Sequence, residues 1–115
     1  MIKVSVLYPY SENTHFDIDY YVNTHAPMAL KKIGSALKGF AIEHGSCGRE
    51  PGSSPTYIAM GHMYYDSIED FQTAYGPHAE VIRRDIPNYT DITPILQISD
   101  VRYSKTPHIR VTAWN

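Results

Sequence analysis

The order of its periodic segments constrains this chain most strongly. Four segments have the residue pattern of β-strands, and a capping-box sequence that predicts a helix follows the first and the third of them. The predicted order is therefore strand–helix–strand–strand–helix–strand. In a chain of 115 residues, which is the size of one domain, this order is typical of an α+β ferredoxin-like fold. Such a fold has a four-stranded antiparallel sheet with both helices on one face.

The strand predictions rest on alternation and on turn residues. The first strand covers residues 2–8, where every second side chain is apolar, and Pro9 ends it. The other predicted strands cover residues 37–47, 57–65 and 91–101. Within the second, Phe40 and Ile42 share one face. These strands provide the sheet, and the Gly-, Ser- and Pro-rich stretch 48–55 is a loop.

The first helix is predicted from the spacing of Thr14 and Asp17, which matches a capping box. It should begin near residue 15. Pro27 lacks a backbone N–H, so the helix should kink or restart there before it ends at Gly34.

The second helix is predicted from Ser67 and Asp70, which repeat the capping-box spacing. Gly76 should interrupt it, and Pro77 can open a second helical piece, because proline is well tolerated in the first turn of a helix. The stretch 85–91 has the composition of a structural turn before the last strand.

The third and fourth strands carry apolar residues on both faces. Two helices cover only one face of such a sheet, so the sheet of a second copy would cover the other. We therefore expect a homodimer packed sheet to sheet. The alternative is that the second face carries scattered exposed apolar residues, which is common on protein surfaces.

Charge and composition exclude several classes of protein. The net charge is −2 and the isoelectric point is about 6.3, so nothing indicates nucleic-acid binding. No apolar run approaches the roughly 20 residues of a membrane span, and no leader pattern is visible at the start. The single cysteine, Cys47, forms no internal disulfide and suits a reducing compartment. We expect a soluble cytoplasmic protein.

Common cofactor and metal motifs are absent, including glycine-rich phosphate loops, HExxH and CxxC. We therefore predict no cofactor and no metal site. The chemistry available is that of histidine, tyrosine and aspartate, which suits general acid–base catalysis.

His25 is the first candidate. It follows Tyr21 by four residues, which a helix places on one side, and it precedes the Pro27 break. His25 is either an acid or base in a pocket between helix and sheet, or a ring that bonds a backbone group at the kink.

His62 is the second candidate, in the middle of the third strand. We expect Met60 and Tyr64 on its face, with Phe40 and Ile42 across the neighbouring strand. It is either a satisfied buried donor or a site residue. Gly61, which precedes it, has no side chain and therefore also permits another group to approach closely on the other face of the strand. His78, at the predicted helix restart, and Tyr89, at one end of a pocket, are further candidates.

Four ordered motifs resemble the EthD family. Residues 16–27 resemble its FDxDYYxxxHxP opening, and residues 61–67 resemble its GHLYFDS junction. Residues 71–78 and 85–92 resemble two more family segments. The resemblance covers residues 1–103, and the tail 104–115 is a C-terminal extension beyond it.

The resemblance implies a dimeric α+β barrel and a connection with ethyl tert-butyl ether degradation. Family members are often described as reductases or oxidoreductases, and related barrels include cofactor-free monooxygenases, isomerases, cyclases and haem-binding enzymes. Carried over by position, His25 and His62 are the catalytic candidates, and the substrate-binding candidates are Tyr21, Tyr64, His78 and Tyr89.

Three functions follow from these observations. The first is an oxidoreductase-type enzyme that acts on a small apolar organic compound, in which a histidine moves protons and tyrosines hold the substrate oxygen. The second is a non-catalytic binding or accessory protein that supports a partner oxygenase or another redox-system partner. The third is haem binding through one histidine.

Overall fold

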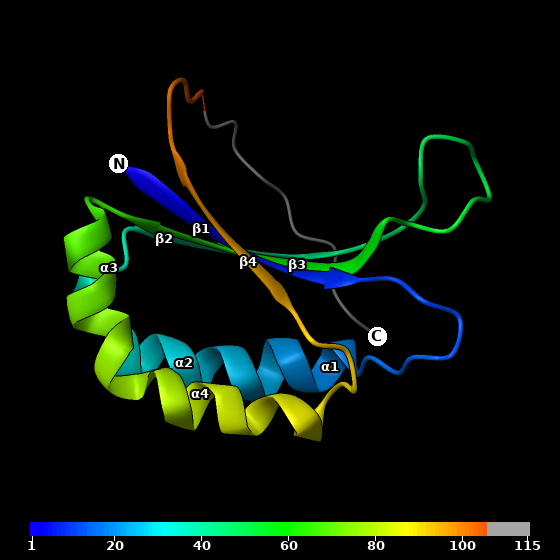
Figure 1. The fold of residues 1–115 in the computed structure, drawn as a ribbon, viewed down its shortest axis with the longest axis horizontal. Coiled ribbons are helices and arrows are strands. Elements are labelled where there is room, and N and C mark those ends of the chain that lie inside the picture. Colours follow the sequence, from blue (N-terminus) through cyan, green and yellow to red (C-terminus); the bar gives the residue numbers. More distant parts are fainter. Residues whose placement is uncertain (106–115) are drawn as a thin grey trace.

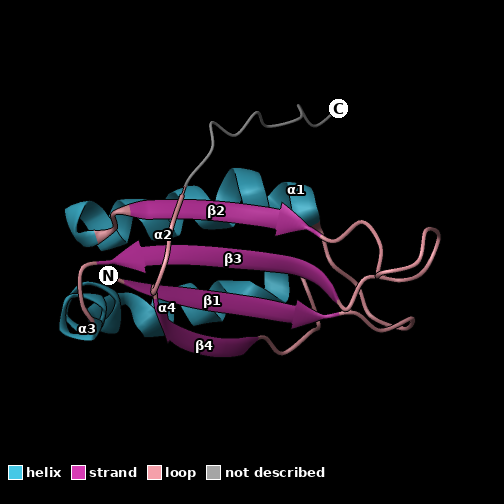
Figure 2. Ribbon diagram, turned by 90° about the horizontal axis from the view of Figure 1, so that it is seen from above, coloured by secondary structure: helices cyan, strands magenta, loops and turns pink. Residues whose placement is uncertain are grey.

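The computed structural model describes residues 1–105 and confirms the α+β ferredoxin-like fold (Figure 1). One antiparallel sheet contains β1 (Ile2–Pro9), β2 (Gly39–His44), β3 (Tyr57–Tyr65) and β4 (Ile95–Asp100). The order of strands across the sheet is β2-β3-β1-β4 (Figure 2). Most of the predicted C-terminal extension, residues 106–115, lies outside the described residues.

Two helical segments cover one face of the sheet, and no helix among residues 1–105 covers the other (Figure 1). The first contains α1 (Ile18–Tyr20), a π-helical turn η1 (Tyr21–His25), α2 (Ala26–Ile33) and a short turn η2 (Gly34–Ala36). The second contains α3 (Ile68–Tyr75), the turn η3 (Gly76–His78), α4 (Ala79–Asp85) and the turn η4 (Ile86–Asn88).

The first helical segment begins later than the sequence predicts. Asp17, and not Thr14, is the N-cap, and its carboxylate accepts a hydrogen bond of 3.1 Å from the backbone N–H of Tyr20. Just before this cap, Phe16 forms an isolated antiparallel bridge with Thr90. The bridge keeps the backbone extended up to residue 16, so the helix begins at residue 18 and not near residue 15.

The other helix predictions are confirmed. Pro27 lies in the first turn of α2, where its missing N–H breaks no helical hydrogen bond, and Gly34 ends that helix with a φ of 76°. Ser67 caps α3 by accepting a 3.0 Å hydrogen bond from the N–H of Asp70. The second segment is interrupted at Gly76, as the sequence predicts.

Two strands are shorter than predicted. β2 occupies only Gly39–His44 of the expected range 37–47. β4 begins at Ile95 and not at residue 91 or 92. The hydroxyl of Thr90 accepts the backbone N–H of Ile92, which ties this part of the chain into a turn. Ile92 therefore enters the core from a loop and not from the strand.

The core lies between the sheet and the helices in two clusters. The first is mainly aliphatic and contains Ile2, Val4, Ile33, Met63, Tyr65 and Phe71. The second is rich in tyrosine and contains Tyr8, Tyr21, Ala59, Tyr89 and Ile92. The π-helical turn packs against the second cluster, so this cluster supports the candidate site.

The strand register assigns side chains to the two faces of the sheet. Phe40 pairs with Met63, and the buried Met63 identifies their side as the face beneath the helices. His62 pairs with Ala41 and Ser5, and it therefore lies on the open face. The expectation that Phe40 and Ile42 flank His62 is wrong, because side chains of successive residues in a strand point to opposite faces.

Candidate functional site

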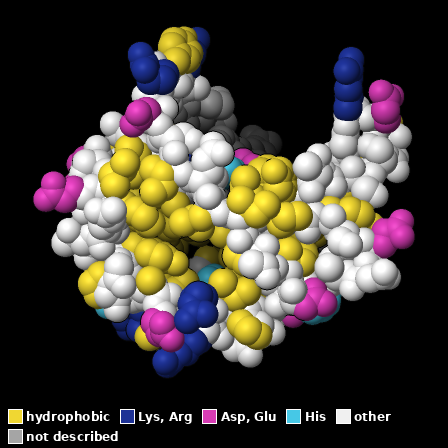
Figure 3. Space-filling view, in the orientation of Figure 1, with side chains coloured by type: hydrophobic (Ala, Val, Ile, Leu, Met, Phe, Trp, Pro, Cys, Tyr) yellow, Lys and Arg dark blue, Asp and Glu magenta, His cyan; other side chains and the backbone are white. Residues whose placement is uncertain are grey.

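A cavity of about 370 Å³ lies between the helices and the sheet. Its lining is mostly apolar, and Figure 3 shows hydrophobic side chains gathered around a hollow beside β4, with a histidine visible inside it. Both strands and helices contribute to this lining, among them Val6, Tyr21, His25, Phe40, Gly61 and Leu96. A small organic molecule with an apolar body fits such a space.

The π-helical turn places His25 and Tyr21 at this cavity. Both side chains are buried, with relative exposures of 6% and 4%, and their ring centroids lie 5.7 Å apart. Single π-helical turns within α-helices are frequent at functional sites. The predicted break of the helix near Pro27 is thus a π-helical turn, and Pro27 lies in the first turn of the regular helix that follows.

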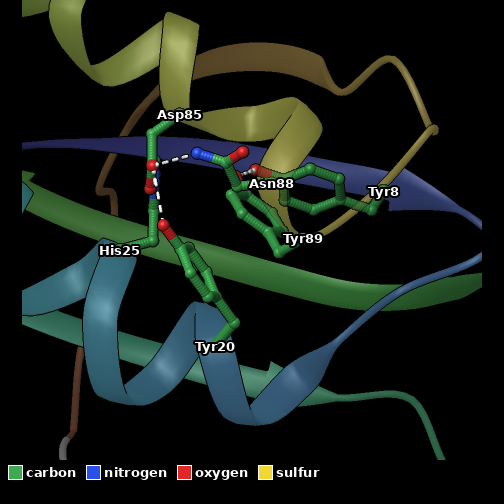
Figure 4. Close-up of polar contacts among 6 residues, drawn as sticks. All are labelled: Tyr8, Tyr20, His25, Asp85, Asn88 and Tyr89. Atoms are coloured by element: carbon green, nitrogen blue, oxygen red, sulfur yellow. Dashed lines mark hydrogen bonds and ion pairs between the residues drawn. The ribbon is translucent and has the colours of Figure 1, made fainter.

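His25 is held by a carboxylate that is 60 residues away in the sequence. Its Nδ1 lies 2.9 Å from Oδ2 of Asp85, at the end of α4 (Figure 4). An ionised carboxylate only accepts hydrogen bonds, so Nδ1 carries the proton and Nε2 keeps a lone pair. Nε2 has no hydrogen-bond partner among residues 1–105, and no buried side-chain nitrogen or oxygen of that part lacks one. Nε2 is therefore accessible and not buried without a partner. Because His25 lines the cavity, a molecule bound there can reach this nitrogen.

Asp85 is itself held in place by two further donors. The hydroxyl of Tyr20 donates to its Oδ1 at 2.8 Å, and the side-chain amide of Asn88 donates to the same oxygen at 2.9 Å. Figure 4 shows the Asp85 carboxylate directed toward His25 and the Tyr20 hydroxyl, with Asn88 beside it. Three hydrogen bonds from three elements fix the carboxylate, and the carboxylate in turn fixes the imidazole ring.

The surroundings set the protonation of this pair. Burial lowers the pKa of His25 below its usual value, and the charge and hydrogen bond of Asp85 only partly oppose this effect. Burial acts to raise the pKa of Asp85, but the hydrogen bonds from Asn88, His25 and Tyr20 outweigh it and lower that pKa. At neutral pH the pair is therefore a neutral imidazole beside a carboxylate, which is the state that a general base needs.

Gly61 makes room for Tyr21. A Cβ atom at position 61 would lie 2.5 Å from the Tyr21 hydroxyl oxygen, well inside van der Waals contact. Burial, with smaller contributions from the charge of Tyr8 and a hydrogen bond to it, raises the pKa of Tyr21, so its hydroxyl stays protonated. To donate to an oxygen of a bound molecule, this proton has to turn away from Tyr8. The predicted close approach at Gly61 is confirmed, and the group that approaches is this phenol.

Tyr89 supports the site without lining the cavity. It is fully buried, its ring centroid lies 4.7 Å from that of His25, and its hydroxyl is 2.6 Å from the hydroxyl of Tyr8. Burial also raises the pKa of Tyr89 and of Tyr8, so both phenols remain neutral. Tyr89 therefore packs behind His25 and fixes the position of its ring.

The structure separates the two candidate histidines. His62 is on the open face, where its Nδ1 lies 3.1 Å from Oγ of Ser5 and its Nε2 lies 3.2 Å from Oε1 of Glu43. Both ring nitrogens are therefore occupied. Tyr64 lies on the same open face, where its ring is 5.9 Å from the Lys3 ammonium. Neither residue lines the cavity that contains His25.

His78 lies in the turn η3, at the start of α4, and it does not line the cavity either. The structure thus brings together His25, Tyr21 and Tyr89 of the predicted site residues. It does not bring His62, Tyr64 or His78 to them.

Sequence reasoning missed Asp85 and Asn88, which it assigned to a structural turn. The role of Asp85 depends on its contacts with His25 and Tyr20 in the first helical segment, which no local pattern records. Asn88 acts on the site only through its hydrogen bond to Asp85, three residues earlier in the chain. The one available signal is that residues 85–92 form one of the motifs noted above.

In residues 1–105 no group of three or more His, Cys, Asp or Glu side chains could hold a metal ion. The helices of the same range are all too short or too polar to cross a bilayer.

Fold and site together define a class of protein: a small α+β ferredoxin-like domain with an apolar cavity and a histidine–aspartate pair beside it. The model of the EthD domain matches residues 12–93, which is more than half of the chain. This chain therefore belongs to the EthD family.

Two solved structures are similar to this chain. An EthD-like protein from Ralstonia eutropha is 43% identical with a TM-score of 0.86, and the match covers 91% of this chain and 95% of that one. An ethyl tert-butyl ether degradation (EthD) family protein from Bacillus halodurans is 26% identical with a TM-score of 0.66, covering 88% of this chain and 98% of that one. No curated protein matches the sequence with significant similarity.

Proposed function

We propose that this chain is a small enzyme that removes a proton from an apolar, oxygen-bearing organic compound, with His25 as the general base. The observation that supports this proposal is the 2.9 Å contact between His25 Nδ1 and Asp85, which leaves the lone pair of Nε2 accessible at an apolar cavity. Phenols and enolisable ketones are the substrate classes, because each has a weakly acidic proton whose removal places negative charge on an oxygen.

Tyr21 supplies the second part of this proposed mechanism. Its protonated hydroxyl donates a hydrogen bond to the substrate oxygen, where negative charge develops as the proton leaves. The mostly apolar lining of the cavity strengthens this interaction, because charges interact more strongly in surroundings of low dielectric constant. His25 then carries the proton, and the Asp85 carboxylate stabilises the imidazolium that forms.

An oxidoreductase function builds on the same step. A phenolate or enolate gives up electrons more readily than its neutral parent, and molecular oxygen is the oxidant that a cofactor-free site would use. This finer assignment depends on oxygen uptake, whereas the proton transfer does not. The two are therefore measured separately.

The test is a panel of small phenols and enolisable ketones, incubated with the wild-type protein and with His25→Gln in deuterated buffer. Deuterium incorporation next to the carbonyl reports proton transfer, and an oxygen electrode reports oxidation. We expect at least one compound to react with the wild type, and the His25→Gln variant to lose that reaction. If compounds bind but none reacts, the chain is a binding protein of the accessory type, and the proposal fails.

A further inference from the structure

The mouth of the cavity differs in charge from its interior. Among the described lining residues, Glu80 and Arg83 carry full charges, and both come from α4. Figure 3 shows basic side chains at the edge of the hollow, with an acidic side chain next to them. The side chains of Arg83 and Glu80 are more than half exposed, so they belong to the rim and not to the buried end that holds His25.

The charge at this rim is not balanced. Oε1 of Glu80 forms ion pairs with Nη2 of Arg83 at 3.2 Å and with Nη2 of Arg84 at 3.3 Å. Two guanidinium groups thus share one carboxylate, which leaves one net positive charge beside the opening. A guanidinium carries five N–H donors, so Arg83 keeps donors for a second anion after it has bonded Glu80.

We propose that Arg83 selects substrates with an anionic oxygen group, chiefly a carboxylate, at the end of the molecule away from His25. The apolar body of such a molecule fills the cavity, its acidic hydroxyl or enolisable group faces His25, and its carboxylate bonds Arg83 at the mouth. This inference rests on the proposed function, because it names the substrate class for the same cavity. The ligand is an amphipathic organic acid and not a neutral hydrocarbon.

Arg84 provides a matched control. It lies next to Arg83 on the same short helix, it is exposed to a similar extent, and it forms an ion pair with the same Glu80 oxygen. Unlike Arg83, it does not line the cavity. Its substitution therefore removes the same charge from the same surface without removing a donor from the mouth.

The experiment measures dissociation constants for two pairs of phenols by calorimetry. Each pair shares one body and differs in its tail: para-ethylphenol with para-hydroxyphenylacetate, and para-propylphenol with para-hydroxyphenylpropionate. The proteins are the wild type, Arg83→Gln, Arg84→Gln and Glu80→Gln. We expect Arg83→Gln to weaken at least one acid by about fivefold, the effect of losing one exposed ion pair, and to leave the alkylphenols unchanged.

Two control variants distinguish a direct contact of Arg83 with the acid from the general charge of this surface. Arg84→Gln should change the affinity for each acid by less than about twofold, and Glu80→Gln should tighten acid binding, since it frees Arg83 from its present partner. Equal effects of Arg83→Gln and Arg84→Gln would overturn the inference, because they would reflect surface charge alone. So would wild-type protein that binds the alkylphenols but neither acid.

This result is separable from the general-base proposal. Equal effects of Arg83→Gln and Arg84→Gln on acid binding, together with retained His25-dependent proton transfer, would remove only the role of Arg83. Wild-type protein that binds none of the four phenols would overturn the role of Arg83 and would count against phenols as substrates.

Discussion

On each side of the sheet a buried histidine lies beside an acidic residue, but only one of these two histidines has a ring nitrogen available for chemistry. His25 and His62 are almost equally buried, at 6% and 7% exposure. His62 uses both ring nitrogens, and its partner Glu43 is half exposed to solvent. His25 uses one nitrogen, for the largely buried Asp85, and its other nitrogen is accessible at the cavity. Burial alone thus does not identify a candidate base; an accessible lone pair at a cavity does.

The largest expected effect tests this contrast directly. His25→Gln should reduce turnover by roughly a hundredfold to ten-thousandfold, the usual contribution of a general base. His62→Gln is the matched variant, since it removes a histidine of similar burial, and it should leave turnover within a few-fold. The measurement is kcat/KM on the best substrate of the panel. Comparable losses in the two variants would mean that the two faces do not differ in function.

Asp85→Asn should have the next largest effect, roughly a hundredfold on kcat, the upper end of the usual loss when a group that orients a histidine is removed. The amide of asparagine can donate to Nδ1, which would place the ring proton on Nε2 and remove the lone pair that the base needs. A variant that folds normally but keeps full activity would contradict the positioning role of Asp85.

The same variant has a defined effect on the pH profile. His25 must be neutral to act as a base, so activity falls as the pH drops through the lowered pKa of His25, below about 6.5. The Asp85 carboxylate raises that pKa, so its removal should shift the acid limb to lower pH. The free energy of unfolding also decreases as the pH falls, because His25 binds a proton more readily in the unfolded state than in the folded state. The folded protein therefore loses stability as the pH falls from about 6.5 through the pKa of folded His25.

A third prediction concerns the floor of the cavity. Gly61→Ala should lower the free energy of unfolding by about 1–3 kcal/mol, because the new methyl group would overlap the Tyr21 hydroxyl. Adding Tyr21→Phe removes that oxygen, and the nearest remaining ring atom is 3.7 Å away, so the double variant should regain part of the loss. Chemical denaturation measures both. Gly76→Ala, where a Cβ meets nothing within 4 Å, is the control.

The smallest expected effect concerns the open face of the sheet. We propose that this face packs against that of a second copy, which would make the protein a homodimer in solution. Ile95 pairs with Leu7 on this face and is 51% exposed in the single chain. Ile95→Glu should therefore raise the dimer dissociation constant by about tenfold or more, with little effect on the fold of each copy. Analytical ultracentrifugation tests this, and a monomeric wild type at micromolar concentration would disprove the homodimer.

The sequence determined the order of the elements, the capping of α3 by Ser67, the breaks at Gly34 and Gly76, and the candidacy of His25 and Tyr21. These features depend on neighbouring residues: alternation, capping spacing, and the missing N–H of proline are local properties of the chain. The same local logic failed at residue 15 and at residue 91, where the Phe16–Thr90 bridge and the Thr90 turn override the pattern.

The tertiary structure decided the site itself. Asp85 reaches His25 across 60 residues of sequence, and the strand register sends His62 to the opposite face from the cavity. Local residue spacing predicts neither fact. A hydrogen bond between two helical segments depends on how both pack against the sheet, and the helices also decide which face of the sheet is covered. The sequence thus supplied the reactive residues, and the packing selected which of them share a cavity.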